Sequence, residues 1–417
     1  MPALEYRPLN ALPLRVQSQE ISFFEWVTLL TLCLTPLVAH ILVGVPSPTH
    51  LDGKRPTWHH RICHYNPTSI LWRYAIIADR RIRAQNWSKA DLAATNALFW
   101  TGERWDGSEA MTKCTHQHCV HLPEDTRASF FSREMVKTLI VTFQGLQAIT
   151  LLSGGLTEGA IGFTKWMAVD IIFFPIALIG LLRLLCCFWI TDDFSYPSPN
   201  NVSPCRRSGN STDNFSCSCR QPDSSGQSFE RFSEDNRFLP TTYWRSILFR
   251  LVYGLSILGL LALAICYAIS GGNYTATTFT VLLFYLVFLA ATTIIFFIFF
   301  VCKHETTTII PCISETWYQI YTGCIISFAV IAIVIACLET RKSPCGKFTS
   351  GYGHDADVRA CLGSVADAIP VSEGIDEPFF GLAAYGFTKK NNGSFVKVDD
   401  TQQVANFTGM CLGKLEL

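Results

Sequence analysis

Long apolar segments are the feature that most limits the folds open to this chain. A transmembrane helix needs about 20 predominantly apolar residues to cross ~30 Å of hydrocarbon. Segments that meet this requirement occur at 26–46, 166–190, 246–269, 277–302 and 319–338. The composition agrees, because 16% of the residues are charged, against about 25% in soluble domains. The sequence therefore predicts an integral membrane protein.

A further segment, 136–154, is shorter and contains Lys137, Gln144 and Gln147. We interpret it as a span because residues 154–165 then form a short return into the next apolar segment. The expected fold class is an all-α integral membrane protein with about six transmembrane helices. The alternative is a five-span protein in which 136–154 stays outside the bilayer and every later loop changes sides.

The charges that flank the first span predict its orientation. Glu20 and Glu25 precede the span at 26–46, whereas Lys54 and Arg55 follow it. Cytoplasmic loops carry an excess of Lys and Arg, so the N-terminus is expected to lie outside the cell.

With six spans, this orientation divides the rest of the chain between the two sides of the membrane. Segment 1–25 and region 339–417 are expected to be extracellular, whereas loops 47–135 and 191–245 are expected to be cytoplasmic. The second loop is rich in Ser, Asn, Pro and Arg and poor in aliphatic residues. Such a segment buries too little apolar area to offset its ordering entropy, so we expect it to be disordered.

Glycosylation sequons give a second view of the orientation. The regions expected outside contain sequons at Asn273, Asn392 and Asn406, which predict a glycoprotein. Sequons also occur in loop 191–245, and these oppose its cytoplasmic placement. Because short sequons arise by chance in segments rich in Ser and Asn, we give more weight to the arginines.

Loop 47–135 contains a predicted helix that starts at Asn66-Pro67-Thr68-Ser69. Its apolar residues share one face at helical spacing: Leu71, Tyr74, Ala75, Ala78 and Ile82. Arg73, Arg80 and Arg83 occupy another face, so the helix is suited to contact anionic lipid headgroups.

A capping box at Ser88 and Asp91 predicts a second helix, which continues through Trp100. The alternative to lipid contact is that the two helices pack on each other as a small cytoplasmic domain. Both interpretations place a basic helical domain after the first span.

Two groups of His and Cys residues in the same loop form a potential metal site. They are His59, His60, Cys63 and His64 in the first group, and Cys114, His116, His118, Cys119 and His121 in the second. Zinc is bound by Cys sulfur and His nitrogen in tetrahedral geometry, usually through two short ligand pairs. The spacing matches no standard zinc finger, and histidines are also ordinary polar residues beside membranes. Zinc binding and a simple surface role are therefore both open.

Polar residues inside the predicted spans are a third kind of candidate. Asp170 and Arg183 lie about 20 Å apart along one helix at ~1.5 Å per residue, so they do not pair with each other. We expect Arg183 to extend toward the cytoplasmic surface. With Gln144 and Gln147 facing inward, these side chains would line a polar path; a passive structural role is the favoured alternative.

Region 339–417 contains Cys345, Cys361 and Cys411. Outside the cell, cysteines close in sequence are disulfide candidates, and we predict a bond between Cys345 and Cys361. Alternating residues at 394–398 favour a strand. The region is expected to be either a small glycosylated domain or loosely ordered.

Familiar enzyme motifs are absent from the sequence, including the Walker loop, the dinucleotide fingerprint, H-E-x-x-H and the nucleophile elbow. A net charge of +0 indicates no nucleic-acid partner. The stretch WHHRICHYNPTSILWRYAIIADRRIRAQNWSKADLAATNALFW at 58–100 resembles uncharacterised polytopic membrane proteins of filamentous fungi. This resemblance implies a eukaryotic secretory route and no activity.

The leading hypothesis is a six-span plasma-membrane protein without enzymatic activity that acts in transport, sensing or scaffolding. One alternative is a membrane-bound enzyme that uses a metal held by the two His/Cys groups. A second alternative is an adhesion or receptor protein that acts through 339–417.

Overall fold

The computed structural model describes most of the chain before residue 353 and short segments after it. The described residues are 9–51, 54–115, 118–157, 166–197, 237–269, 272–343, 346–352, Ala356 and the strand segments 368–369, 382–383, 387–389, 395–397 and 404–406.

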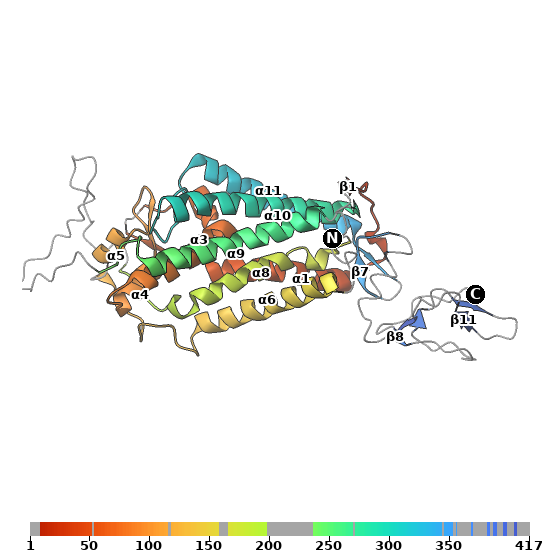
Figure 1. Ribbon diagram of the computed structural model, residues 1–417, viewed down its shortest axis with the longest axis horizontal. Helices are drawn as coiled ribbons and strands as arrows, with labels where there is room; N and C mark the ends of the chain where they lie inside the picture. The colour runs from red at the N-terminus through yellow and green to blue at the C-terminus, as the bar shows by residue number, and fades with distance from the viewer. Residues whose placement is uncertain are drawn as a thin grey trace, which may run out of the picture.

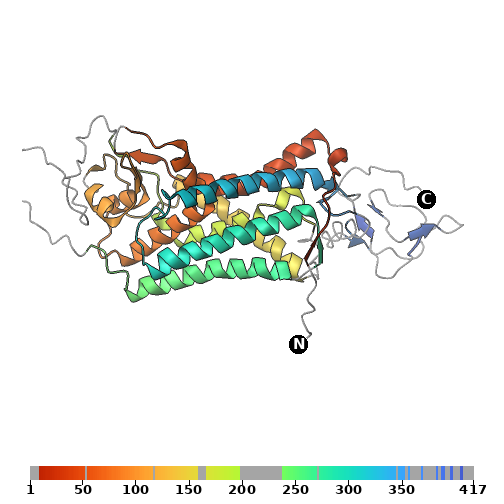
Figure 2. The ribbon, with the colours of Figure 1, turned by 90° about the horizontal axis from the view of Figure 1, so that it is seen from above.

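Long helices run side by side as an elongated bundle (Figures 1 and 2). They are α1 (Phe23–Gly44), α6 (Arg133–Thr157), α9 (Trp244–Ile269), α10 (Ala276–Ile295) and α11 (Thr316–Glu339). A π-helical segment, η9 (Phe296–Cys302), extends α10. Among the described residues, 4 helices are long and apolar enough to cross a membrane: α1, α9, α10 with η9, and α11. The molecule is therefore a mostly helical protein of the membrane type.

The two remaining predicted spans differ from the other four. Segment 136–154 lies within α6, a continuous helix of 25 residues that packs between α1 and α8 (Phe174–Gly180). Segment 166–190, expected as one helix, is broken into η4 (Val169–Ile171), α8, η5 (Leu181–Leu185) and η6 (Cys187–Trp189). Pro175 at the start of α8 explains part of this break, because proline donates no backbone hydrogen bond.

Helix α3 (Pro67–Arg83) confirms the predicted helix start and lies inside the bundle. Asn66 caps its N-terminus by accepting a hydrogen bond from the Thr68 backbone at 3.0 Å. Almost every side chain of α3 is buried, and Trp72 packs edge-on against Phe296 and Phe300 of η9. The predicted surface helix is thus part of the core.

One end of the bundle carries a small assembly around α4 (Lys89–Asn96) and α5 (Glu109–Thr115), on the left in Figure 1. The capping box of Ser88 and Asp91 is present. The helix ends at Asn96, earlier than predicted. Its neighbours in this assembly are α2 (Trp58–Ile62), η2 (Cys63–Tyr65), β2 (Pro48–His50), β3 (Leu98–Trp100) and β4 (Trp105–Asp106).

The predicted continuation of this helix to Trp100 is replaced by a strand. Strand β3 pairs in parallel with β2 and antiparallel with β4. Trp100 and Trp105 stack edge to face across the β3–β4 pair, with ring centroids 5.0 Å apart. We refer to this assembly, residues 47–51, 54–66 and 84–115 with 191–197, as the head.

The opposite end of the bundle carries short strands. Strand β1 (Leu9–Ala11) pairs in parallel with β5 (Gly272–Tyr274) in the α9–α10 turn, where Asn273 is exposed. The other elements at this end and beyond are η1 (Ser18–Glu20), β6 (Arg341–Lys342), β7 (Phe348–Thr349), β8 (Ala368–Ile369), β9 (Leu382–Ala383), β10 (Phe387–Lys389), β11 (Phe395–Lys397) and β12 (Val404–Asn406). The strand predicted at 394–398 is confirmed by β11.

Candidate functional site

The first His/Cys group does not converge on a common point. His59 stacks on Trp58 and His60, while His60 contacts Trp100. The Cys63 thiol donates to the His59 carbonyl at 3.4 Å, and Cys63 is buried. His64 packs edge-on against Trp105, with ring centroids 4.4 Å apart. These contacts are aromatic packing rather than a ligand cage.

The second group is also dispersed. Cys114 is disulfide-bonded, so its sulfur is not a free thiolate for a metal. The Cys119 thiol donates to the His121 carbonyl at 3.0 Å, and His121 Nε2 contacts Asp193 at 2.9 Å.

The two groups therefore do not assemble a metal centre within the described ranges. There, no three or more His, Cys, Asp or Glu side chains gather as a possible metal site. His116 lies outside the described residues, as do Asn392 and the Cys345–Cys361 pair. Zinc binding stays a prediction that no described geometry supports.

The three arginines expected on a lipid-facing surface are buried inside the protein. Arg80 donates to Thr112 Oγ1 at 2.8 Å and to the Gly107 and Thr306 carbonyls at 2.7 Å. Arg73 donates to Asn96, and Arg83 pairs with Asp79 at 3.0 Å. The basic face of α3 is thus turned inward, which argues against headgroup contact through these side chains.

Asp79 of α3 forms the centre of a buried ion-pair cluster. Its Oδ2 accepts from Arg250 of α9 at 2.6 Å and from Arg83 at 3.0 Å. Ser246 donates to Asp79 Oδ1, and Arg250 also donates to the Phe300 carbonyl at 2.7 Å. This cluster ties α3, α9 and η9 together.

Arg183 forms a second buried pair and does not extend to the surface as expected. Its Nη2 lies 2.6 Å from Glu134 Oε2 of α6, and its Nη1 donates to the Val43 carbonyl at 2.8 Å. A further bond runs to Thr138. Because the pair joins the broken segment 166–190 to α6 and α1, its role is structural.

The other polar residues that were predicted to line a polar path do not lie along a common path. Gln147 is exposed on the outer surface of α6, while Gln144 is half-buried. Asp170 is half-buried in η4, far along the chain from Arg183. Only Arg183 of these four takes part in a described ion pair.

Glu134, Asp79 and Arg250 were missed as site residues from sequence. The available signals were a charge inside an apolar run at Arg250 and a single acid within a basic helix at Asp79. Buried ion pairs fix partners and geometry, but they add little net stability over apolar packing. All three side chains are occupied by protein partners, so the function must be sought elsewhere.

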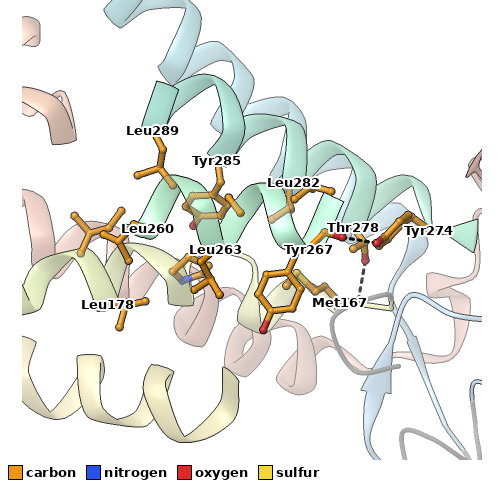
Figure 3. A pocket seen from close by; sticks show the side chains of 14 residues that line it. Met167, Leu178, Leu260, Leu263, Tyr267, Tyr274, Thr278, Leu282, Tyr285 and Leu289 are labelled. Carbon is orange, nitrogen blue, oxygen red and sulfur yellow. Dashed lines mark hydrogen bonds between the residues drawn. The ribbon is translucent and has the colours of Figure 1, made fainter. Parts of the chain in front are cut away.

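An apolar cavity with a volume of about 90 Å³ lies between α8, α9 and α10. Figure 3 shows Leu282, Tyr285 and Leu289 of α10 opposite Leu260, Leu263 and Tyr267 of α9. The α9 side chains are half-buried, so the cavity reaches the outer surface of the bundle. Its walls are almost entirely hydrocarbon.

The polar groups of this cavity gather at one end. Thr278 Oγ1 accepts from the Met167 backbone at 3.0 Å, and the Tyr274 hydroxyl donates to the Tyr267 carbonyl at 2.7 Å (Figure 3). These residues flank the α9–α10 turn, where the bundle ends. Leu260 and Leu289 line the cavity farther from this turn, so the cavity is polar at the end of the bundle and apolar toward its middle.

Comparison with known protein families, characterised proteins and solved structures finds no match to this chain.

Proposed function

We propose that this chain is a multi-pass membrane protein that binds an acyl chain of a membrane lipid between α8, α9 and α10. The observation that carries the proposal is the apolar cavity, which is bounded by two of the candidate membrane spans. This function deepens the predicted transport or sensing role and requires no catalytic residue.

The position of the cavity supports a lipid over a water-soluble ligand. Residues 278 and 289, which bound it along α10, are about 16 Å apart at ~1.5 Å per residue. Tyrosines mark its outer end, and such residues are enriched where membrane meets water. An acyl chain would run inward from this end, because the deeper wall is formed by aliphatic side chains and by Tyr285, whose hydroxyl is already bonded to the Ile172 carbonyl.

The test is photocrosslinking of the full-length protein in vesicles of phosphatidylcholine that carries a diazirine on one acyl chain. We expect labelled peptides from 260–289. Ala264 lines the cavity, so Ala264→Phe fills it and should reduce labelling at least several-fold.

The matched control is Ala262→Phe, on the same helix but at an exposed position. It should label as the unchanged protein does. Equal labelling of both variants would mean that the lipid contacts only the outer surface, and the proposal would fail.

The proposed orientation keeps the head in the cytoplasm. Basic residues at the head end of the spans favour it, since Arg245 precedes the apolar part of α9 and Lys303 follows η9. The Cys114 disulfide favours the opposite orientation, because disulfides persist in oxidising compartments.

Glycosidase-shift mapping decides between these orientations. The described residues that flank 198–236 contact the head, whereas Asn273 lies in the α9–α10 turn at the other end of the bundle. We therefore expect only one of the two sets of sequons to meet the glycosylation machinery. We expect a shift that becomes smaller in Asn273→Gln. A shift that is unchanged in Asn273→Gln and becomes smaller in Asn210→Gln would reverse the orientation.

The remaining expectations stay proposals. They concern the plasma membrane as the location, fungal origin, glycosylation and the action of 339–417 as an adhesion region. Neither the metal-enzyme nor the adhesion alternative has a supporting contact among the described residues.

A further inference from the structure

A second cavity lies where α3 meets the head; it is small, and its lining is partly polar and partly aliphatic. Its volume is about 10 Å³, and its lining includes Arg73, His64, Ser69, Gly44 and Ile309. A cavity of this size holds about one water-sized species. The cavity is separate from the apolar one, which involves neither α3 nor the head.

Two buried donors face this cavity without a protein partner. Arg73 is 6% exposed and His64 is 8% exposed. Arg73 Nη2 donates to the Asn96 carbonyl at 2.8 Å and to Asn96 Oδ1 at 3.1 Å, whereas Arg73 Nη1 has no acceptor. His64 Nε2 is likewise without a partner.

The charge of Arg73 also lacks compensation. Its side-chain bonds run to neutral groups of Asn96, and Glu134, a carboxylate that acts on it electrostatically, is already held by Arg183 and Lys137. An isolated charge in a low-dielectric interior is costly unless an opposite charge accompanies it. A water molecule would satisfy the donors but not the charge.

The geometry points to a binding site for a single monatomic anion, a halide such as chloride, held between Arg73 Nη1 and His64 Nε2. The cavity volume excludes polyatomic anions such as phosphate. The edge-on packing of His64 against Trp105 holds the His64 ring, and the hydrogen bonds to Asn96 hold the Arg73 guanidinium.

The protonation state of His64 agrees with this arrangement. Burial, together with the nearby Arg73 guanidinium, lowers the pKa of His64 to about 3. The ring is therefore neutral at physiological pH and donates one N–H. Arg73 alone supplies the positive charge, which matches a monovalent anion.

The test measures thermal unfolding of the detergent-solubilised full-length protein in sodium chloride against sodium gluconate at constant ionic strength. Chloride should raise Tm in a saturable manner, as expected for a ligand that binds only the folded state. Removing one hydrogen bond to an ion costs about tenfold or more in affinity. His64→Phe keeps the ring against Trp105 and should weaken the chloride dependence by about that factor.

Arg73→Gln should abolish the chloride dependence, and the matched control Arg245→Gln, at an exposed arginine, should leave it unchanged. If the Arg73→Gln variant does not fold, the chloride dependence of the His64→Phe variant still tests the proposal. Equal Tm in the two salts would indicate water alone and overturn the proposal. An unaltered chloride response in His64→Phe would also overturn it, because the anion would then bind elsewhere.

Discussion

Helices α3 and α9 lie side by side and invert the pattern of a water-soluble core. Helix α9 is among the most apolar segments of the chain, yet it exposes Leu255, Leu248 and Val252. Helix α3 carries Arg73, Asp79, Arg80 and Arg83, yet all four are buried. The charged helix is inside and the apolar helix is outside.

This difference in burial between α3 and α9 indicates which solvent surrounds the bundle. In hydrocarbon, an exposed leucine costs nothing, whereas an exposed charge is expensive and turns toward the protein interior. The arginines of α3 find carbonyls and carboxylates there. The exposure pattern is therefore independent evidence for a membrane environment, beyond the length of the apolar helices.

The largest expected effect comes from removing the acidic side chain that joins α3 to α9. Asp79→Ala leaves Arg250 buried without its carboxylate, which costs about 3–5 kcal/mol, whereas Arg83 keeps its ion pair with Glu109. We expect a large drop in Tm in detergent or loss of the folded protein.

Asp192→Ala is the control for this variant. Asp192 pairs with Lys137 but its side chain is 47% exposed, so its loss should cost at most about 1 kcal/mol. Similar effects for the two variants would mean that the Asp79 cluster does not hold the helices together.

A second test places a charge on the outer surface of α9. Leu255 is 63% exposed near the middle of the helix, and an arginine at the bilayer centre costs about 2.5–3.5 kcal/mol for insertion. Leu255→Arg should reduce the fraction that resists carbonate extraction.

Leu14→Arg, at an exposed leucine outside the long helices, is the control and should have no effect. In a soluble protein both changes would stay within about 0.5 kcal/mol. Normal membrane insertion of Leu255→Arg would therefore argue that α9 does not face lipid.

The smallest expected effect concerns the packing of α1 on α3. A Cβ on Gly44 would lie 2.3 Å from Ile70 Cγ2, and overpacking of this kind costs about 1–3 kcal/mol. Gly44→Ala should lower Tm measurably.

Gly259→Ala is its counterpart on α9, where an added Cβ meets nothing within 4 Å. That change should be neutral or stabilise by up to about 1 kcal/mol through helix propensity. If both variants behave alike, α1 and α3 are not in close contact.

Local sequence signals predicted the helices well. The caps at Asn66 and Ser88 and the apolar runs at α1, α9, α10 and α11 were all identified, because they depend on short-range chemistry. Segment 166–190 was not, because its composition is apolar throughout and only Pro175 indicates the break. The environment of α3 was also not predicted, since the same basic face fits an anionic lipid surface or a buried network.

Most of the candidate sites could not be predicted from the sequence. The cavity between α8, α9 and α10 is lined by ordinary leucines and tyrosines, and these have no pattern apart from their spatial arrangement. The Arg73–His64 pair was recognised only as separate members of a basic face and a potential metal group. Neither interpretation could anticipate that α3 brings them to one cavity.

The interrupted segment before α8 has a consequence for assembly. Tyr285 of α10 donates its hydroxyl to the Ile172 carbonyl at 3.0 Å, in the stretch where the helix is broken. A bare carbonyl cannot be left in hydrocarbon, because no water is available to replace its partner. The carbonyl therefore gains its hydrogen-bond partner only after α10 has packed against this stretch. We expect residues 169–175 to reach their final conformation late in membrane insertion and folding. Since the same tyrosine lines the apolar cavity between α8, α9 and α10, we expect that cavity to be completed in the same step.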